Sequence, residues 1–357
     1  MKSPGFDNFH CSRDLGIPEI TQADVTGIKI GVESPSGRDQ LRVFEVSENE
    51  TARQRPFLRK FVRLQIVLIA LLLLLARKSP AQQVFDSHVH LWEGEKSLRL
   101  YEAEAKTAGI DLVGFGGMWF GGPRQALSGH PDEIRASNDA HFALAKKHPE
   151  MVPIATVHPY DGEAALEEVS RVAALGFKVL KLHPHTQKFD PSDPRVLAVV
   201  IRAGDLSMIV LVDNFNIIPG DSEKLFNLAL AAPRTKFIYA HLGGMNFRFW
   251  NVIRATRTAK GLYTDNIYFD IAGTTVLLKD APIRDEFVWT IRGVGADHVL
   301  LGSDYPQFTL GETLAAFEKL NLTAEEKMKI RYQNARTLFA QHTLASGDPC
   351  SGGTGSH

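Results

Sequence analysis

From residue 84 onward, the chain alternates between short apolar stretches and longer amphipathic ones. In the amphipathic stretches, such as EAALEEVSRVAAL at residues 163–175, apolar positions recur every three or four residues. This spacing is typical of surface helices, whereas short runs of Val, Ile, Leu and Phe are typical of buried strands. Eight strands are predicted, over residues 84–91, 111–119, 151–158, 178–184, 207–215, 235–242, 266–273 and 298–304.

The regular succession of strand and helix predicts parallel strand pairing, because parallel neighbours need a long crossover connection. A (β/α)8 barrel typically takes about 250 residues, which matches the patterned region at residues 83–342. A doubly wound sheet is the alternative, but no GxGxxG motif opens the first helix as dinucleotide binding would require. We therefore expect an α/β protein with a (β/α)8 TIM barrel over residues 83–342.

The N-terminal part of the chain has a different character. Residues 1–55 are polar and without a period, and we expect them to be disordered or to be upstream sequence included by a misplaced start. Residues 56–82 begin with basic side chains, continue with an apolar run from Leu64 to Ala76 and end in small residues, which is the pattern of a secretory signal peptide. The run is shorter than the ~18–20 residues that a membrane span requires.

These features predict a periplasmic or secreted protein. The alternative is an uncleaved anchor formed by residues 61–76, and we expect no membrane contact outside residues 56–82. The Gly/Ser-rich segment at residues 343–357 is expected to be a disordered tail.

Composition excludes several classes of function. The formal net charge is −1, and no basic run with interleaved aromatics follows residue 85, so nucleic acid is not an expected partner. The two cysteines, Cys11 and Cys350, lie outside the barrel region, so a metal site there must use histidines and carboxylates. We expect a small-molecule substrate, and the sequence leaves a homo-oligomer open.

Candidate chemistry begins in the first predicted strand, FDSHVHLW. Asp86, His88 and His90 alternate there, so we expect all three on one face of the strand. Two neutral imidazoles side by side suit a divalent cation, although ordinary core or surface histidines are the plainer interpretation. Further polar residues fall at predicted strand ends, where barrel enzymes carry their chemistry: Lys181, His183, Asp213, His241 and Asp304.

The motifs HVH, KLHP, YAHLGG and LGSDYP, on the first, fourth, sixth and eighth predicted strands, resemble the amidohydrolase superfamily. More narrowly, they are similar to its amidohydrolase-related branch, which includes aminocarboxymuconate-semialdehyde decarboxylase. The resemblance implies that His88 and His90 are metal ligands and that Asp304 is a ligand and proton acceptor. It implies that His241 polarises the substrate or transfers a proton.

The fifth predicted strand departs from the family pattern. Many relatives carry a metal-binding histidine there, whereas this chain has Asp213, which we expect to be a ligand in its place. His183 is the alternative, and a carboxylated Lys181 is a further option known from binuclear relatives. Histidine and carboxylate ligands lead us to expect Zn²⁺, with Mn²⁺ as the alternative.

Four residues are expected to contact the substrate. Trp119 lies in a glycine-rich loop that we interpret as a lid over the catalytic rim, and Arg248 is positioned to hold a carboxylate. His158 and His183 lie at the ends of the third and fourth predicted strands. For each of the four, a packing role or a surface ion pair is the competing interpretation.

These observations favour a metal-dependent hydrolase that attacks a small ester, lactone or amide with a metal-activated water. A non-oxidative decarboxylase or hydratase of an unsaturated or aromatic acid would use the same ligands. A catalytically silent binding barrel is the third alternative, and Asp213 is the residue that favours it.

Overall fold

The structure is a computed structural model that describes residues 83–340. The predicted upstream segment at residues 1–55, the signal peptide or anchor at residues 56–82 and the tail at residues 343–357 lie outside these described residues. Within residues 83–340, no helix is both long enough and apolar enough to span a membrane.

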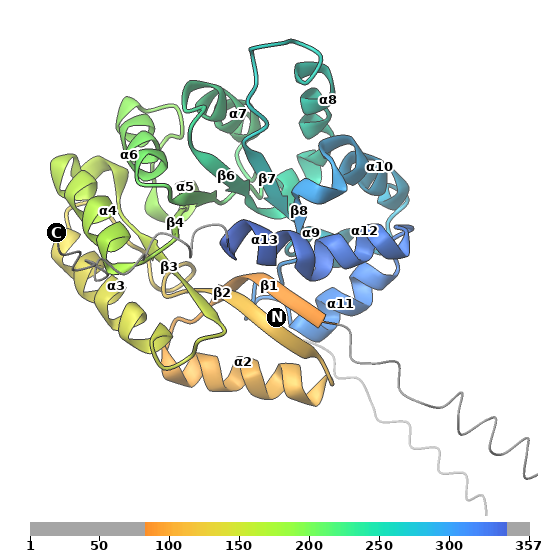
Figure 1. Cartoon of the computed structure of the whole chain (residues 1–357), viewed down its shortest axis with the longest axis horizontal. Coiled ribbons are helices and arrows are strands. Elements are labelled where there is room, and N and C mark those ends of the chain that lie inside the picture. The colour runs from red at the N-terminus through yellow and green to blue at the C-terminus, as the bar shows by residue number, and fades with distance from the viewer. Residues whose placement is uncertain (1–82, 341–357) are drawn as a thin grey trace, which may run out of the picture. The chain divides into compact units, whose positions relative to one another are not determined.

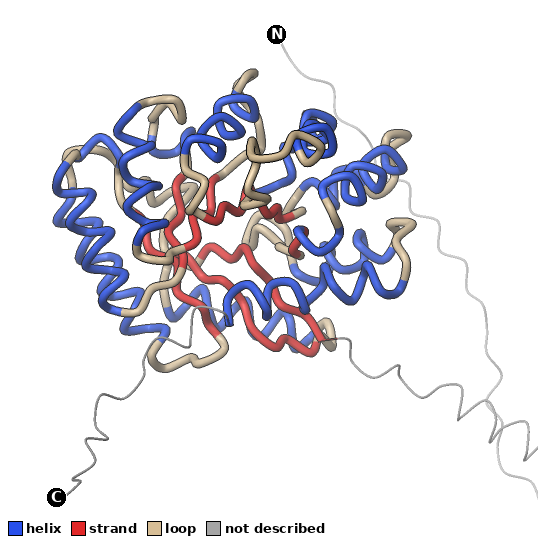
Figure 2. The backbone as a smooth tube through the Cα atoms, turned by 45° about the horizontal axis from the view of Figure 1, so that its top comes forward, coloured by secondary structure: helices blue, strands red, loops and turns tan. Residues whose placement is uncertain are grey.

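The eight strands run parallel and pair in chain order, which confirms the predicted TIM barrel. Figure 2 shows the strands at the centre with helices outside them. The chain after the last strand completes the circle, because the Asp304 amide donates to the His88 carbonyl at 2.9 Å and Val89 pairs with Tyr305. The strands are β1 Gln83–His90, β2 Asp111–Met118, β3 Met151–Thr156, β4 Val179–Leu182, β5 Ile209–Val212, β6 Lys236–Tyr239, β7 Ile267–Asp270 and β8 Val299–Leu300.

Helical segments connect successive strands and cover the outside of the barrel (Figure 1). Their ends follow local chemistry: Thr309 and Glu312 form a reciprocal capping box at the start of α11, and Gly176, with φ 110°, ends α4. The helices are α2 Glu95–Thr107, α3 Pro131–Ala145, α4 Glu163–Leu175, α5 Pro184–Gln187, α6 Pro194–Asp205, α7 Asp221–Ala231, α8 Val252–Thr256, α9 Thr274–Leu278, α10 Arg284–Val294, α11 Leu310–Glu318, α12 Ala324–Met328 and α13 Asn334–Ala340.

Several strands end earlier than their hydrophobic pattern predicts. The sixth was expected to reach residue 242, but β6 ends at Tyr239 because His241 and Leu242 adopt left-handed backbone angles, with φ of 63° and 46°. The residues that follow a strand are therefore free to turn their side chains over the end of the barrel.

The barrel interior is filled by apolar side chains over its lower part. Phe85 from β1 packs against Phe339 from α13, with ring centroids 5.3 Å apart. The same buried cluster includes Ile154, Ile209 and Ile238 from three other strands. Because α13 contributes to this cluster, it closes the end of the barrel opposite the predicted active site.

β1 contains an irregularity that changes which side chains face the interior. Asp86 pairs with Phe115 and Val89 with Gly117, so β1 has one extra residue between these pairs. The expectation that Asp86 shares a face with His88 and His90 is therefore wrong. The phase changes at the bulge, and the Asp86 carboxylate faces away from the two imidazoles.

Asp86 instead ties β1 to the segment after β8. Its buried carboxylate accepts hydrogen bonds from the Ser303 hydroxyl at 2.6 Å, the Ser303 amide at 2.8 Å and the Tyr101 hydroxyl at 3.0 Å. Because Ser303 immediately precedes Asp304, this contact positions the Asp304 backbone against β1. Asp86 is thus a structural neighbour of the predicted ligands.

A buried histidine between α3 and β2 should make stability depend on pH. The His141 ring nitrogen Nε2 contacts the Gly117 carbonyl at 2.7 Å, and burial lowers the pKa of His141 from 6.5 to about 4. As the pH falls from 6.5 to 4, the unfolded chain binds a proton that the folded chain does not, so the folded state loses stability.

We predict that His141→Gln, which keeps an amide donor for Gly117, makes the free energy of unfolding less dependent on pH in this range. The difference in slope should be at most about 1.4 kcal/mol per pH unit. Urea unfolding of both proteins between pH 4 and 7 measures it. Parallel stability curves for the parent and the variant would contradict the assigned role.

Candidate active site

The two histidines of β1 lie side by side, two residues apart on the same strand. Their Nε2 atoms are 3.2 Å apart. His88 Nδ1 lies 3.0 Å from the Asp270 carboxylate, and His90 Nδ1 lies 2.6 Å from the Phe120 carbonyl. Both partners are acceptors, so each Nδ1 is placed to donate a proton and each Nε2 is directed toward the other ring.

Asp304 completes this arrangement from the segment after β8. Its Oδ1 lies 3.4 Å from His88 Nε2 and 3.3 Å from His90 Nε2. Burial acts to raise the pKa of Asp304, but the neighbouring His90 and His88 rings hold that pKa below its usual range. The group is therefore a carboxylate at neutral pH.

Three electron-pair donors thus converge on one small space. Burial, together with the charge of Lys181, lowers the pKa of His88 to about 4, so its ring is neutral at physiological pH. Two imidazole nitrogens and one carboxylate oxygen are the donors that a divalent zinc or manganese site uses. The residues present therefore fit the metal that the sequence leads us to expect.

Lys181 also lies next to these ligands. It projects from β4, is fully buried, and places Nζ 3.3 Å from His88 Nε2. Burial lowers the pKa of Lys181. The KLHP motif marked this lysine in the sequence, but its contact with His88 could not be read from residues 93 positions apart.

His241 and Asp213 form a second pair beside the ligands. His241 Nε2 lies 3.0 Å from Asp213 Oδ2, and its Nδ1 lies 2.9 Å from the Ala272 carbonyl. Because both partners accept, both ring nitrogens carry protons and His241 is an imidazolium. Burial alone would lower the pKa of His241, but the hydrogen bond and charge of Asp213 outweigh it and raise that pKa to about 9.

The turn after β6 fixes this imidazolium. The His241 amide donates to Asp270 at 2.9 Å, and the Thr274 hydroxyl donates to the His241 carbonyl at 2.7 Å. Gly244, with φ 55°, allows the chain to pass against the Phe215 carbonyl, which lies 2.3 Å from where a β-carbon would be. The glycines of the AHLGG motif therefore serve a close backbone approach.

The candidate residues border a pocket with a volume of about 220 Å³. His90, His183, Asp213, His241 and Asp304 line it. The sequence reasoning missed its remaining walls, which come from loops whose residues carry no catalytic signal: Trp92, Gly122, Phe215, Ile217 and Gln307.

Of the other predicted site residues, only His183 reaches this pocket, and its Nε2 lies 3.7 Å from Asp213 Oδ2. His158 Nδ1 accepts from the Tyr160 amide and its Nε2 contacts the Gln187 carbonyl at 2.6 Å, so both ring nitrogens bond to backbone. Arg248 pairs with Glu286 and is not among the residues that line the pocket.

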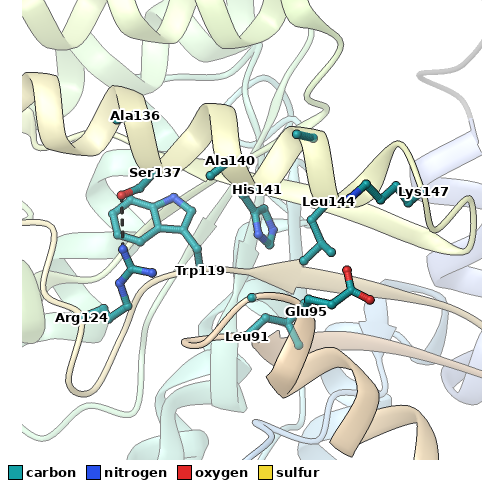
Figure 3. Close-up of a pocket in the computed structure, with 12 residues that line it drawn as sticks. Leu91, Glu95, Trp119, Arg124, Ala136, Ser137, Ala140, His141, Leu144 and Lys147 are labelled. Carbon is teal, nitrogen blue, oxygen red and sulfur yellow. Dashed lines mark hydrogen bonds between the residues drawn. The ribbon is translucent and has the colours of Figure 1, made fainter.

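Trp119 points away from the pocket as well. Its indole Nε1 donates to Asn138 at 2.8 Å, and the ring borders a separate cavity along α3. Figure 3 shows Trp119 there with Arg124, whose guanidinium is hydrogen-bonded to Ser137. Substrate contact by His158, Trp119 and Arg248 stays a prediction that this geometry does not support.

The loop that follows Trp119 nevertheless serves the site. The Phe120 carbonyl orients His90, and Gly121 lies against the same ring, with Nδ1 2.7 Å from where a β-carbon would be. Any side chain at Gly121 would displace His90. The glycine-rich sequence was therefore a signal of function, but through the backbone rather than through the aromatic side chain.

A comparison with protein families matches residues 85–341 to the amidohydrolase model. The chain belongs to the amidohydrolase family. The match spans the whole described barrel, and it agrees with the resemblance of the four motifs. A comparison with curated proteins found no match.

Solved structures of other amidohydrolases share the fold at low sequence identity. A putative amidohydrolase from Staphylococcus aureus has a TM-score of 0.58 and 18% identity, covering 73% of this chain and 99% of its own. A 5-carboxyvanillate decarboxylase from Sphingomonas paucimobilis has a TM-score of 0.56 and 15% identity, covering 73% and 99%. A 5-carboxyvanillate decarboxylase from Novosphingobium aromaticivorans, complexed with manganese and 4-hydroxy-3-methoxy-5-nitrobenzoic acid, has a TM-score of 0.54 and 16% identity, covering 73% and 96%.

The contacts of Asp270 and Asp213 predict opposite effects on metal binding. Asp270→Asn keeps an oxygen for the His241 amide but offers its amide group to His88 Nδ1, which favours the wrong tautomer for a ligand. We predict that it weakens metal affinity about 10–100-fold. Asp213→Ala should leave the affinity close to that of the parent, since Asp213 contacts His241 and His183.

Isothermal titration of the metal-free proteins with Mn²⁺ and Zn²⁺ measures these affinities. Asp265→Asn is a matched control, because this aspartate pairs with Arg257 far along the chain from the ligands. If Asp213→Ala loses metal as strongly as Asp270→Asn, then Asp213 is the ligand that the sequence led us to expect.

Proposed function

We propose that this amidohydrolase is a divalent-metal-dependent, non-oxidative decarboxylase of a small aromatic or unsaturated acid. The observation that carries the proposal is the charge state of His241. Hydrogen-bonded to two acceptors, it holds a proton beside the predicted metal ligands. Decarboxylation leaves a carbon that must gain a proton, whereas hydrolysis must first remove one from water.

The reaction balances without a further reactant. The bond between the substrate carbon and its carboxylate breaks, carbon dioxide leaves, and the electron pair stays on the carbon, which takes up one proton. His241 is the donor, and Asp213 stabilises the imidazolium that solvent restores after product release. The decarboxylation is therefore balanced in protons and electrons with the residues of this chain.

His88, His90 and Asp304 would hold the metal. A bound divalent cation would act as a Lewis acid that orients the substrate carboxylate and stabilises negative charge that develops next to it. Both Zn²⁺ and Mn²⁺ suit this donor set, and the Novosphingobium relative contains manganese. We therefore propose a divalent metal, and the affinities of the purified protein for Zn²⁺ and Mn²⁺ decide between the two ions.

The apolar walls of the pocket support an aromatic or unsaturated substrate. Trp92, Phe215 and Ile217 line it, and the Phe215 ring lies 5.1 Å from the His241 ring, centroid to centroid. Two of the structural relatives are named as decarboxylases of a benzoic acid derivative. The hydrolase that the sequence favours uses the same ligands and stays the second candidate, because Asp304 lies where a base for water would be required.

We predict that the metal-loaded protein releases carbon dioxide from at least one member of a panel of benzoic and unsaturated acids, with one equivalent of decarboxylated product. Evolved carbon dioxide and product are measured by mass spectrometry. The Asp304→Asn protein serves as the inactive control. Turnover of esters, lactones or amides without carbon dioxide from any acid would reject the decarboxylase in favour of the hydrolase.

The role of His241 predicts a characteristic dependence of rate on pH. The acid must be protonated, so activity should fall as pH rises through the pKa of His241, which is about 9. Asp213→Asn removes the charge that raises this pKa, so the alkaline limb should move to lower pH. His241→Gln should lower kcat about 10²–10⁴-fold.

Measurements of kcat between pH 6 and pH 10 test both effects. Metal content is determined in parallel, so that a loss of the ligands is not mistaken for a loss of the acid. An unchanged alkaline limb in an active Asp213→Asn protein would show that His241 is not the proton donor.

A further inference from the structure

The pocket at the metal site lacks a group that many acid-binding sites contain. Among the described residues that line it, none is lysine or arginine. Two of the lining residues are the aspartates Asp213 and Asp304, and Phe215 contributes an apolar wall.

Three basic side chains that do not line the pocket make contacts of their own. Lys181 is fully buried, contacts His88 Nε2 through Nζ at 3.3 Å and does not line the pocket. Arg124 donates to the Trp92 carbonyl at 3.2 Å and faces the cavity along α3 shown in Figure 3. Arg248 pairs with Glu286. Within residues 83–340, no lysine or arginine therefore lines the pocket beside the part of a substrate that lies away from the metal.

A carboxylate that enters such a pocket without a counter-charge loses its hydration and gains no partner. The proposed metal and His241 would be the partners of the reacting carboxylate. A second one would meet apolar walls and the two aspartates, and like charges repel strongly where water is excluded.

We propose, on the basis of the proposed function, that the substrate is a monocarboxylic acid whose remaining part is uncharged. The pocket volume of about 220 Å³ lies below the ~300–1,000 Å³ of typical sites for drug-sized ligands, so the acid is small. Gln307 lines the same pocket, and its carboxamide makes no hydrogen bond to the described residues, so it is available to a neutral polar substituent.

Three probes separate charge from size. Benzoate, 3-carbamoylbenzoate and isophthalate share one carboxylate on one ring. In 3-carbamoylbenzoate a neutral amide replaces the second carboxylate of isophthalate, which has nearly the same shape. Binding of each to the full-length, Mn²⁺-loaded protein is measured by isothermal titration calorimetry at pH 7.5, which does not depend on turnover.

We expect benzoate and 3-carbamoylbenzoate to bind with similar affinity and isophthalate to bind at least about tenfold more weakly. Gln307→Arg introduces the missing cation and should strengthen isophthalate binding about tenfold or more, with a much smaller effect on 3-carbamoylbenzoate. Gln125→Arg adds the same charge on the glycine-rich loop, at a residue that does not line the pocket of the metal site, and should leave the preference unchanged.

Isophthalate binding as tight as that of 3-carbamoylbenzoate in the parent protein would overturn the inference. So would a Gln307→Arg protein that still discriminates against isophthalate, because charge would then not be the cause. If the binding preference is found but no acid in the panel releases carbon dioxide, the proposed decarboxylation fails and the monoacid site stands. If diacids bind and lose carbon dioxide as readily as monoacids, the inference fails and the decarboxylase stands.

Discussion

Two imidazole nitrogens that face each other beside a carboxylate dominate the chemistry of this barrel. The Nδ1 atoms of His88 and His90 each contact an acceptor, and their Nε2 atoms meet at 3.2 Å next to the Asp304 carboxylate. In a buried site such an arrangement is unfavourable unless a cation lies between the donors. A divalent metal satisfies all three at once.

Contacts from several other elements maintain this geometry. The bulge in β1 turns both histidines inward, and Asp86 on the other face holds Ser303 and hence the start of the Asp304 segment. Asp270 on β7 sets the tautomer of His88, and the same carboxylate accepts from the His241 amide. One aspartate therefore couples the metal ligands to the proposed acid.

The sequence predicts the architecture well because its signal is local. Alternation of apolar strands and amphipathic helices indicates the barrel, and polar residues at strand ends indicate the catalytic rim. The ends of the strands are less predictable, since the left-handed turn at His241 depends on the close approach of Gly244 to Phe215.

Side-chain partners are less predictable still. Asp86 and Ser303 are 217 residues apart, and His88 and Asp270 are 182 apart, so nothing in a local pattern joins them. Residue type alone was also a poor guide to function, because backbone groups can bind a side chain that the sequence suggests for the substrate. Both ring nitrogens of His158 bond to backbone, although its position after β3 resembled that of a substrate ligand.

The proposed metal ligands and the proposed proton donor thus come from different elements. The ligands come from β1 and the segment after β8, whereas the imidazolium comes from the turn after β6 and its counter-charge from the end of β5. The most direct test of the metal claim is an anomalous difference map from Mn²⁺-loaded crystals. The account predicts one strong peak bounded by His88 Nε2, His90 Nε2 and an Asp304 carboxylate oxygen. A map with no peak there, and with Lys181 Nζ occupying the space between these three groups, would contradict it.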